Sequence, residues 1–241
     1  FGRTIFHYAA MNNKKDLIEF IIKRFTKLDP LFINAEDFKG FTALAYAAEG
    51  DYWDVFKLLQ TKLDANIAHI SVVDGLTILH RACFAKNKSL LEKLLAQKCK
   101  ISELDRDNNT MLHWAASSGS EDIVKLLLDK KADINLQNSL GNFPLHNAAY
   151  AGHANIVNLL LQGKKVSVNL ENAMKSTPMH LAASKGHADV ITMLQSKGAE
   201  VDPLDANNMT PLEVAVQGGQ VEAACALVKM NSKFMKLNKN E

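Results

Sequence analysis

Cysteine, net charge and long hydrophobic runs are all scarce in this sequence of 241 residues. The three cysteines lie far apart and form no CxxC pair. Neither a disulfide framework nor a zinc site is therefore expected, and the cytosol, or alternatively the nucleus, fits best. Lysine and arginine total 28 against 26 acidic residues, so no field of one sign would attract nucleic acid or an anionic membrane. No window approaches about 18 consecutive apolar residues, and we expect no membrane insertion.

Short motifs of common catalytic and nucleotide-binding sites are also missing. The sequence contains no GxGxxG, GxxxxGKS, GxxxxGKT, HExxH or GxSxG, so dinucleotide, phosphate, metalloprotease and α/β-hydrolase sites lack their local requirement. We expect a protein that is not an enzyme and that uses no cofactor and no metal. Apolar residues make up 47% of the chain and charged residues 22%, which favours a folded core over disorder.

Seven stretches of the chain are related to one another. They are TIFHYAA from Thr4, TALAYAA from Thr42, TILHRAC from Thr77, TMLHWAA from Thr110, FPLHNAA from Phe143, TPMHLAA from Thr177 and TPLEVAV from Thr210. Their first residues are 38, 35, 33, 33, 34 and 33 positions apart. A period of about 33 with a T-P-L-H-x-A-A signature is typical of stacked helix pairs, and the sequence resembles the ankyrin-repeat family from Gly2 to about Val228.

The resemblance implies an all-α fold, an ankyrin-repeat solenoid of helix-turn-helix units joined by β-hairpin loops. We expect one such domain over residues 1–230, followed by a frayed C-terminal tail over residues 231–241. The seven repeats should start near Phe1, Asp37, Val72, Asp105, Asn138, Asn172 and Asp205. A single unit cannot bury both of its faces, so stability should come from stacking, and the two end units should provide solubility.

Local chemistry explains most of the repeated positions. The threonine can cap a helix whose first position accepts proline, and a glycine can end the helix in the left-handed conformation. Several repeats depart from this pattern. Phe143 replaces the threonine, Asp51 and Lys86 replace the turn glycine, and Lys175 replaces the hairpin glycine. Ala45 and Glu213 replace the signature histidine. Because the replaced turn glycines lie in the second and third repeats, we predict that the N-terminal half is less stable.

His113, Ser117 and Asp122 lie within ten positions of one another and raise the possibility of a hydrolase triad. The repeats argue against it. His113 has counterparts in His7, His80, His146 and His180, whereas the Ser117 slot holds unrelated residues elsewhere. We expect each signature histidine to be structural, with its ring bonded to backbone near the hairpin. Helices about 8–10 Å apart would also keep neighbouring histidines from sharing one zinc ion.

The resemblance implies that hairpin tips and first helices form a concave surface that binds a protein or peptide. The variable slots on this surface predict the partner-binding residues, and their apolar members concentrate in the second and third repeats. They are Phe38, Phe41, Leu76, Phe84, Arg106, Asn109, Trp114, Asn142, Tyr150, Met174, Lys185 and Met209. Alternatively, the long loop before residue 38 folds back and buries some of these rings.

Asn135 carries a second resemblance. It follows Asp133 and Ile134, with Leu127 eight residues before it, as in ankyrin sites of the asparaginyl hydroxylase of the hypoxia response. Asn135 is also the ordinary hairpin asparagine of the family, so both interpretations stay open.

The function most consistent with these features is a non-catalytic protein-interaction module, expected to be a monomer. The first residue is Phe and not Met, which suggests a fragment of a longer protein. The alternatives are therefore a substrate-recognition or regulatory domain of a larger enzyme whose catalytic part lies elsewhere, or a pathogen protein that engages host partners.

Overall fold

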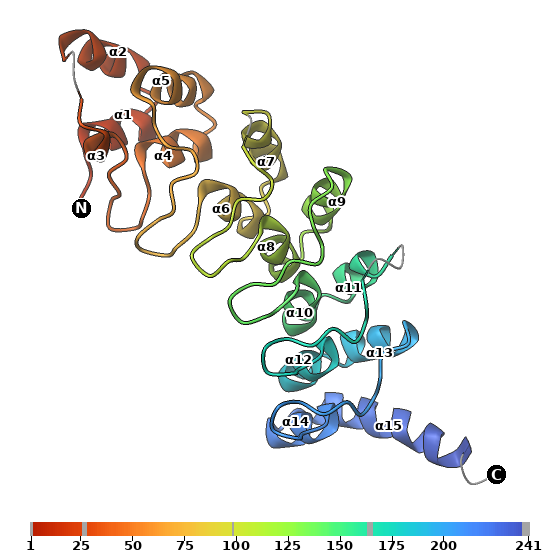
Figure 1. Ribbon diagram of the computed structural model, residues 1–241. Helices are drawn as coiled ribbons and strands as arrows, with labels where there is room; N and C mark the ends of the chain where they lie inside the picture. Colours follow the sequence, from red (N-terminus) through yellow and green to blue (C-terminus); the bar gives the residue numbers. More distant parts are fainter. Residues whose placement is uncertain (1, 26–27, 98, 163–165, 238–241) are drawn as a thin grey trace. The chain divides into compact units, whose positions relative to one another are not determined.

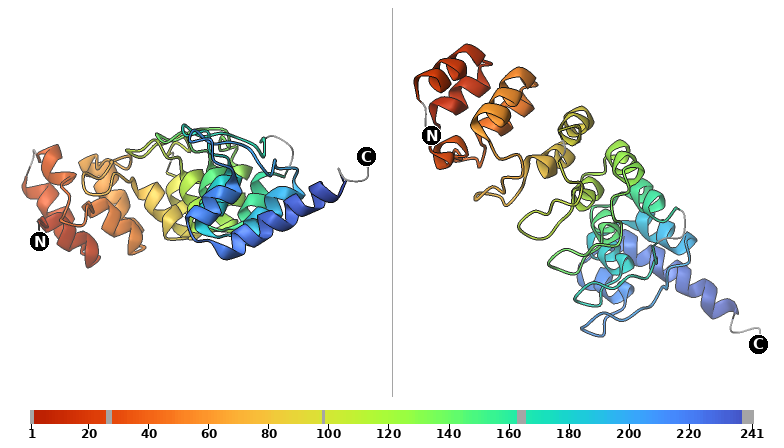
Figure 2. Two further views of the ribbon diagram at one scale, coloured as in Figure 1. Left: turned by 90° about the horizontal axis from the view of Figure 1, so that it is seen from below. Right: turned by 45° about the horizontal axis from the view of Figure 1, so that its top comes forward.

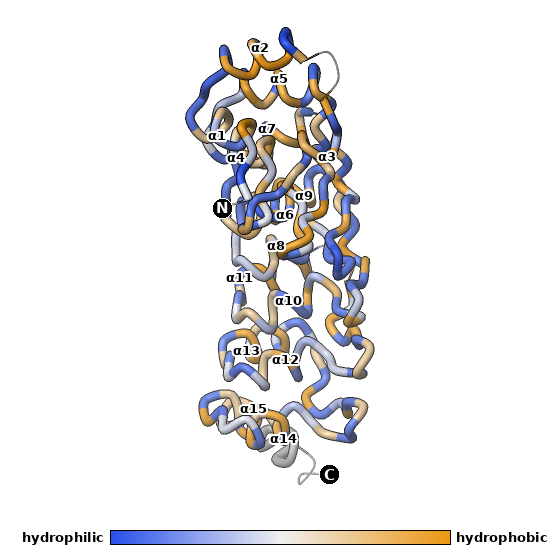
Figure 3. The backbone as a smooth tube through the Cα atoms, turned by 90° about the vertical axis from the view of Figure 1, so that its left-hand side faces the viewer, coloured by the Kyte–Doolittle hydropathy of each residue, from blue (hydrophilic) through white to orange (hydrophobic). Residues whose placement is uncertain are grey.

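The computed structural model describes residues 2–25, 28–97, 99–162 and 166–237 (Figure 1). The described residues form two compact units, which are treated separately below. The first unit contains residues 1–82 and 87–106, and the second contains residues 83–86 and 107–241. All regular elements in these ranges are helices. This agrees with the helix pairs that the resemblance to ankyrin repeats implied. Figure 3 shows hydrophobic positions recurring along the helices, while much of the chain between them is hydrophilic.

The first unit is built from helix pairs with one additional short helix. The pairs are α1 (Ile5–Met11) with α2 (Lys15–Arg24), α4 (Ala43–Glu49) with α5 (Trp53–Leu63), and α6 (Ile78–Phe84) with α7 (Lys88–Leu95). The last two residues of α6, Cys83 and Phe84, are assigned to the second unit. The additional α3 (Pro30–Ile33) lies in the long loop that the sequence predicts to be irregular. There the Asp29 carboxylate accepts a hydrogen bond from the Leu31 N–H at 2.8 Å, so Asp29 caps a new helix beginning at Pro30.

The second unit stacks four helix pairs in sequence. They are α8 (Met111–Ser118) with α9 (Glu121–Asp129), α10 (Pro144–Tyr150) with α11 (Ala154–Leu160), α12 (Pro178–Lys185) with α13 (Ala188–Ser196), and α14 (Pro211–Gln217) with α15 (Val221–Leu237). Within this unit the loops between pairs lie on one side of the first helices, and the second helices lie on the other side (Figure 1 and Figure 2). Paired alanines such as Ala115 and Ala116 are fully buried, which lets successive first helices approach closely.

Four signature histidines, His7, His113, His146 and His180, connect their repeat to the next, as the sequence predicts. In the second unit His113 Nδ1 accepts from the Thr110 N–H at 3.1 Å, and His113 Nε2 donates to the Asn142 carbonyl at 2.9 Å. His146 and His180 make the same contact to the carbonyls of Ser176 and Met209, each at 3.0 Å. In the first unit His7 Nε2 donates to the Phe41 carbonyl at 2.9 Å. The imidazole therefore joins a helix start to the following hairpin.

Two loop features differ from the expectation of β-hairpins and a frayed tail. The hairpins consist of tight turns closed by single contacts, such as the Asn138 N–H to the Asn142 carbonyl at 2.9 Å, and the described residues contain no extended strand. In the stretch expected as a C-terminal tail, residues 231–241, the helix α15 continues to Leu237. No glycine or proline interrupts the chain over residues 221–237, so nothing local stops the helix.

The positions that lack glycine still adopt the left-handed conformation. Asp51 has φ 60°, Lys86 has φ 57° and Lys175 has φ 53°. Glycine occupies the same conformation at Gly119, where φ is 74°. A side chain with a Cβ atom is strained there, and the lower stability predicted for the N-terminal half rests partly on this strain.

The outer face of the first repeat is less polar than expected of an end unit. Ile5, Leu17 and Phe20 are exposed, although their counterparts in α8 and α9 are Met111 and Ile123, both buried, and the half-buried Leu126. The repeat pattern alone does not predict this apolar surface.

Candidate functional site

A groove in the second unit brings hairpin tips and first helices together. It encloses about 610 Å³. We call it the amide groove, because asparagine and serine side chains make up much of its wall. Its lining consists of Ser117, Asn138, Ser139, Leu140, Asn142, Asn147, Tyr150, Asn172, Ala173, Met174 and Leu181. Asn142, Tyr150 and Met174 are therefore the predicted residues that the structure gathers at one place.

The hairpin tips present their apolar side chains outward. Asn138 Oδ1 accepts from the Leu140 N–H and the Asn142 N–H, each at 3.0 Å. Asn172 Oδ1 plays the same part in the next hairpin, accepting from the Met174 N–H at 2.9 Å. These side-chain turns satisfy the loop backbone internally. Leu140 is left 67% exposed and Met174 54% exposed.

Asparagine side chains also connect successive hairpins. Asn138 Nδ2 donates to Asn109 Oδ1 at 2.7 Å, and Asn172 Nδ2 donates to Asn142 Oδ1 at 2.8 Å. Asn109 is buried by this arrangement. Its predicted role as an exposed partner contact is therefore corrected, since Asn109 supports the hairpins from within. Sequence position alone cannot separate Asn109 from Asn142, because both occupy equivalent slots.

The helix side of the groove is held by α10 and α12. Asn147 Nδ2 donates to Ser117 Oγ at 3.1 Å, and His187 Nε2 donates to the Tyr150 carbonyl at 3.0 Å. The ammonium of Lys185 lies 4.6 Å from the centre of the Tyr150 ring, a cation–π distance. Lys185 is therefore a fourth predicted residue at this place, because it lies against the Tyr150 ring. Leu140 and Asn147 are further lining residues, which only the tertiary contacts identify as part of this groove.

Met209, Phe84 and Trp114 occupy other places in the second unit. The Met209 backbone is held by His180 and by the Asp205 carboxylate, which accepts from the Met209 N–H at 3.0 Å, and its side chain is half-buried. The Phe84 and Trp114 rings meet edge to face with centroids 5.6 Å apart, and Phe84 is 60% exposed. Phe84 and Trp114 form an aromatic pair that does not line the groove.

The first unit contains Phe38, Phe41 and Leu76. Phe41 stacks on Tyr46 with ring centroids 5.1 Å apart, and the Arg81 guanidinium lies 4.2 Å from the Phe41 ring centre. Phe41 is consequently half-buried, whereas Phe38 at the tip is 76% exposed. The loop does not bury these rings. Its Phe32 instead packs edge to face on Phe6 at 5.7 Å.

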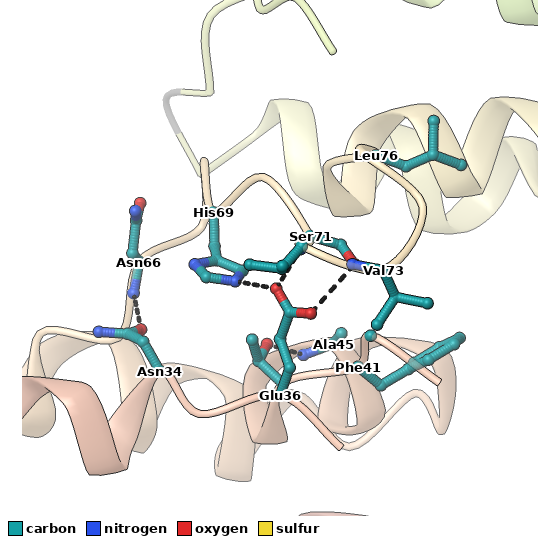
Figure 4. Close-up of polar contacts among 12 residues, drawn as sticks. Asn34, Glu36, Phe41, Ala45, Asn66, His69, Ser71, Val73 and Leu76 are labelled. Atoms are coloured by element: carbon teal, nitrogen blue, oxygen red, sulfur yellow. Dashed lines mark hydrogen bonds and ion pairs between the residues drawn. The ribbon is translucent and has the colours of Figure 1, made fainter. Parts of the chain in front are cut away.

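Polar contacts hold the second and third hairpins of the first unit together (Figure 4). The Glu36 carboxylate lies 2.6 Å from His69 Nε2 and accepts from the Val72 N–H at 2.7 Å. Burial alone would raise the pKa of Glu36, but the hydrogen bonds from His69 and Val72 outweigh it and lower that pKa. Leu76 lines a neighbouring cavity of about 20 Å³, which has room for about one water molecule.

Hydrogen bonds hold two further side chains of the first unit, those of Arg106 and Asp37. Arg106 donates through one guanidinium nitrogen to the Ser71 and Val72 carbonyls at 3.0 and 2.8 Å. Asp37 accepts from the Tyr46 hydroxyl at 2.7 Å and from Arg3 Nε at 3.2 Å. Burial would raise the pKa of Asp37, yet its hydrogen bonds, the one from Tyr46 foremost, lower the pKa to about 2.

The geometry around His113 does not form a hydrolase site. Both ring nitrogens are engaged, one at the helix start and one at the Asn142 carbonyl, and Ser117 Oγ accepts from Asn147. Burial lowers the pKa of the equivalent His146 to about 4, so that ring stays neutral. Among the described residues no three His, Cys, Asp or Glu side chains gather where a metal ion could bind.

Two remaining features stand apart from the groove. Asn135 is exposed, and its N–H donates to the Asp133 carboxylate at 2.9 Å. This local turn is compatible both with a hydroxylation site and with the ordinary hairpin asparagine of the family. Across the described ranges, no helix combines the length and apolarity needed to cross a membrane.

Comparison with known proteins assigns the fold to a family. The family described as ankyrin repeats (3 copies) matches residues 1–71, 50–138 and 145–239. No curated protein sequence matches the chain. Modules of this family generally bind other proteins, and no catalytic domain is detected in the chain. The family match spans both units and accounts for the helix pairs, the hairpins and the recurring histidines, and the chain belongs to the ankyrin-repeat family.

Proposed function

We propose that this chain is a non-catalytic interaction module that binds a protein or peptide segment in the amide groove. The observation that carries the proposal is the exposure of Leu140 and Met174 beside an open groove of about 610 Å³. Hairpin tips are usually polar, and apolar tips that border a groove are typical of binding sites. Tyr150 adds a ring held by Lys185, and rigid aromatic side chains often dominate binding energy.

The partner proposed is a protein and not a nucleic acid. No charged side chain lines the amide groove, whereas nucleic-acid sites depend on Lys and Arg contacts to phosphates.

Cys83, Cys99 and Cys225 are free thiols, and we propose the cytosol or the nucleus as the compartment. We also propose that the chain is a monomer, which sedimentation across a concentration series would check.

A display experiment tests the binding site. A library of random short peptides is selected on the immobilised chain, and the enriched peptides are measured against Leu140→Asp and Met174→Asp. Leu204→Asp is the matched control, because Leu204 is 54% exposed in the same unit and does not line the groove. We expect each groove variant to weaken binding by more than about tenfold, a change of about 1.4 kcal/mol. Equal binding by the groove variants and the control would contradict the proposed site.

A further inference from the structure

The chemistry of the amide groove points to a particular class of partner segment. Eleven residues line it, and none of them is Asp, Glu, Lys, Arg or His. Two lysines stand at its border: Lys175 follows Met174 at the hairpin tip, and Lys185 lies over Tyr150. A charged side chain entering the groove would lose water without gaining a charged partner, which is strongly unfavourable.

The groove also offers polar groups that the fold itself does not use. The Oδ1 atoms of Asn138 and Asn172 are each occupied by two loop N–H groups, and their Nδ2 atoms bond the preceding hairpin. Three other polar groups of the groove lining are not used in this way. Among the described residues, Asn142 Nδ2, Asn147 Oδ1 and the Tyr150 hydroxyl have no hydrogen-bond partner. They supply one donor, one acceptor and one group that can do either.

A free donor and a free acceptor in one groove are the groups that pair with the carbonyl and the N–H of a peptide backbone. Asn142 ends a hairpin, and Asn147 and Tyr150 lie on α10, so these groups run from the tip side of the groove to its helix side. Leu140 and Met174 provide apolar contact at the tips. This combination fits an extended partner segment that is bound through its backbone, with its aliphatic side chains against the hairpin tips.

We propose that the amide groove selects an extended, uncharged segment of a partner protein, held through the main-chain amides of that segment and through aliphatic side chains. This inference rests on the proposed function and adds the chemistry of the partner. Acidic residues of the partner are accommodated only beyond the groove, beside Lys175 and Lys185. Recognition therefore depends little on salt, because no ion pair forms inside the groove.

The test uses the peptides enriched on the intact chain. We expect their central residues to lack charge and to include an aliphatic side chain. High salt should change their affinity by less than about twofold, whereas binding through exposed ion pairs would weaken severalfold. Replacing one central residue of an enriched peptide by Glu or by Lys should each reduce affinity by more than about tenfold.

An isosteric variant tests whether the groove lining determines the preference for uncharged peptides. Asn147→Asp keeps the shape of the side chain and can still bond Ser117 Oγ, which then donates. Selection on Asn147→Asp should enrich peptides with a central Lys or Arg. Gln195→Glu, an exposed isosteric change on α13 outside the groove, is the control and should enrich the wild-type sequences.

The outcomes separate the two proposals. Peptides that depend on Leu140 and Met174 but carry central charges and lose affinity in salt would overturn the inference and leave the proposed function standing. Peptides that bind independently of Leu140 and Met174, or no enriched peptide at all, would overturn both. An unchanged selection on Asn147→Asp would show that the groove lining does not determine the chemistry, which also overturns the inference.

Discussion

The Nε2 atom of His113 lies 2.9 Å from the carbonyl oxygen of Asn142, at the end of the following hairpin. His113 is fully buried, and its other ring nitrogen accepts from the Thr110 N–H. One side chain therefore connects the start of α8 to the loop that carries part of the amide groove. The groove depends on this contact for the position of its hairpin.

His113→Ala should destabilise the second unit by about 2–4 kcal/mol, because a cavity forms and the Asn142 carbonyl loses a donor. Urea unfolding followed by Trp114 fluorescence in a Trp53→Phe background measures the change, because Trp53 of the first unit also fluoresces. His187→Ala is the comparison, since its ring is half-exposed and makes one similar contact to the Tyr150 carbonyl. We expect that variant to cost less than about 1.5 kcal/mol. Equal costs for the two variants would argue against the connecting role of His113.

The second unit should lose stability between pH 6.5 and pH 4. Burial lowers the pKa of His146 from 6.5 to about 4, and the pKa of His180 is also lowered, mainly by burial. The unfolded chain then binds the proton more tightly, so stability is complete above pH 6.5 and falls as the pH drops toward 4. His146 alone accounts for about 3 kcal/mol over that range.

Hydrogen exchange resolved by unit checks this pH dependence. In the first unit the pKa of Asp37 is lowered from 3.8 to about 2, so the contribution of Asp37 is lost only below about pH 4. Protection factors, which correct for the slower intrinsic exchange at lower pH, should therefore fall first in residues 107–230 as the pH drops through 5. A His146→Gln variant should lose less stability between neutral pH and pH 4 than the wild type does. An identical loss would contradict the role of His146.

Phe41 and Phe38 should behave differently when truncated. Phe41→Ala removes a ring held between Tyr46 and Arg81 and should cost about 2 kcal/mol. Phe38→Ala removes a ring that is 76% exposed and should change stability by less than about 0.5 kcal/mol. Thermal melting of the two variants decides the matter, and equal melting temperatures would mean that Phe41 is not part of the core.

Lys86→Gly should stabilise the protein by about 0.5–1 kcal/mol, because Lys86 has φ 57° and glycine adopts that conformation without strain. Gly198→Ala is the reverse change at φ 86°, with no atom within 4 Å of the added Cβ, and should cost about 1 kcal/mol. Slower hydrogen exchange over residues 78–97 in Lys86→Gly measures the gain. Faster exchange there would contradict the prediction that missing turn glycines weaken this region.

A serine-directed covalent probe should leave Ser117 unmodified. The ring nitrogens of His113 are both engaged, so no base is available to activate the Ser117 hydroxyl. Intact-mass measurement after incubation with a fluorophosphonate, with Ser117→Ala as the reference, tests this. Labelling that disappears in Ser117→Ala would show a nucleophile that the geometry does not account for.

Part of the candidate site was predictable because the repeat period marks its slots. Asn142, Tyr150, Met174 and Lys185 were predicted, and they lie in or against the amide groove. Asn109 occupies a slot of the same kind and is buried. The difference arises from the neighbouring Asn138, whose amide reaches back to Asn109 across 29 positions of sequence.

The sequence by itself determined the helix pairs, their caps and the structural use of the histidines. These follow from local preferences, from apolar spacing and from a signature repeated at a period of about 33 residues. Only the tertiary structure decided which variable side chains share a groove, that Arg81 covers Phe41, and that Lys185 holds Tyr150. The two cation–π contacts join residues that are 40 and 35 positions apart in sequence. Their distances depend on how successive repeats pack against one another, which no local pattern specifies.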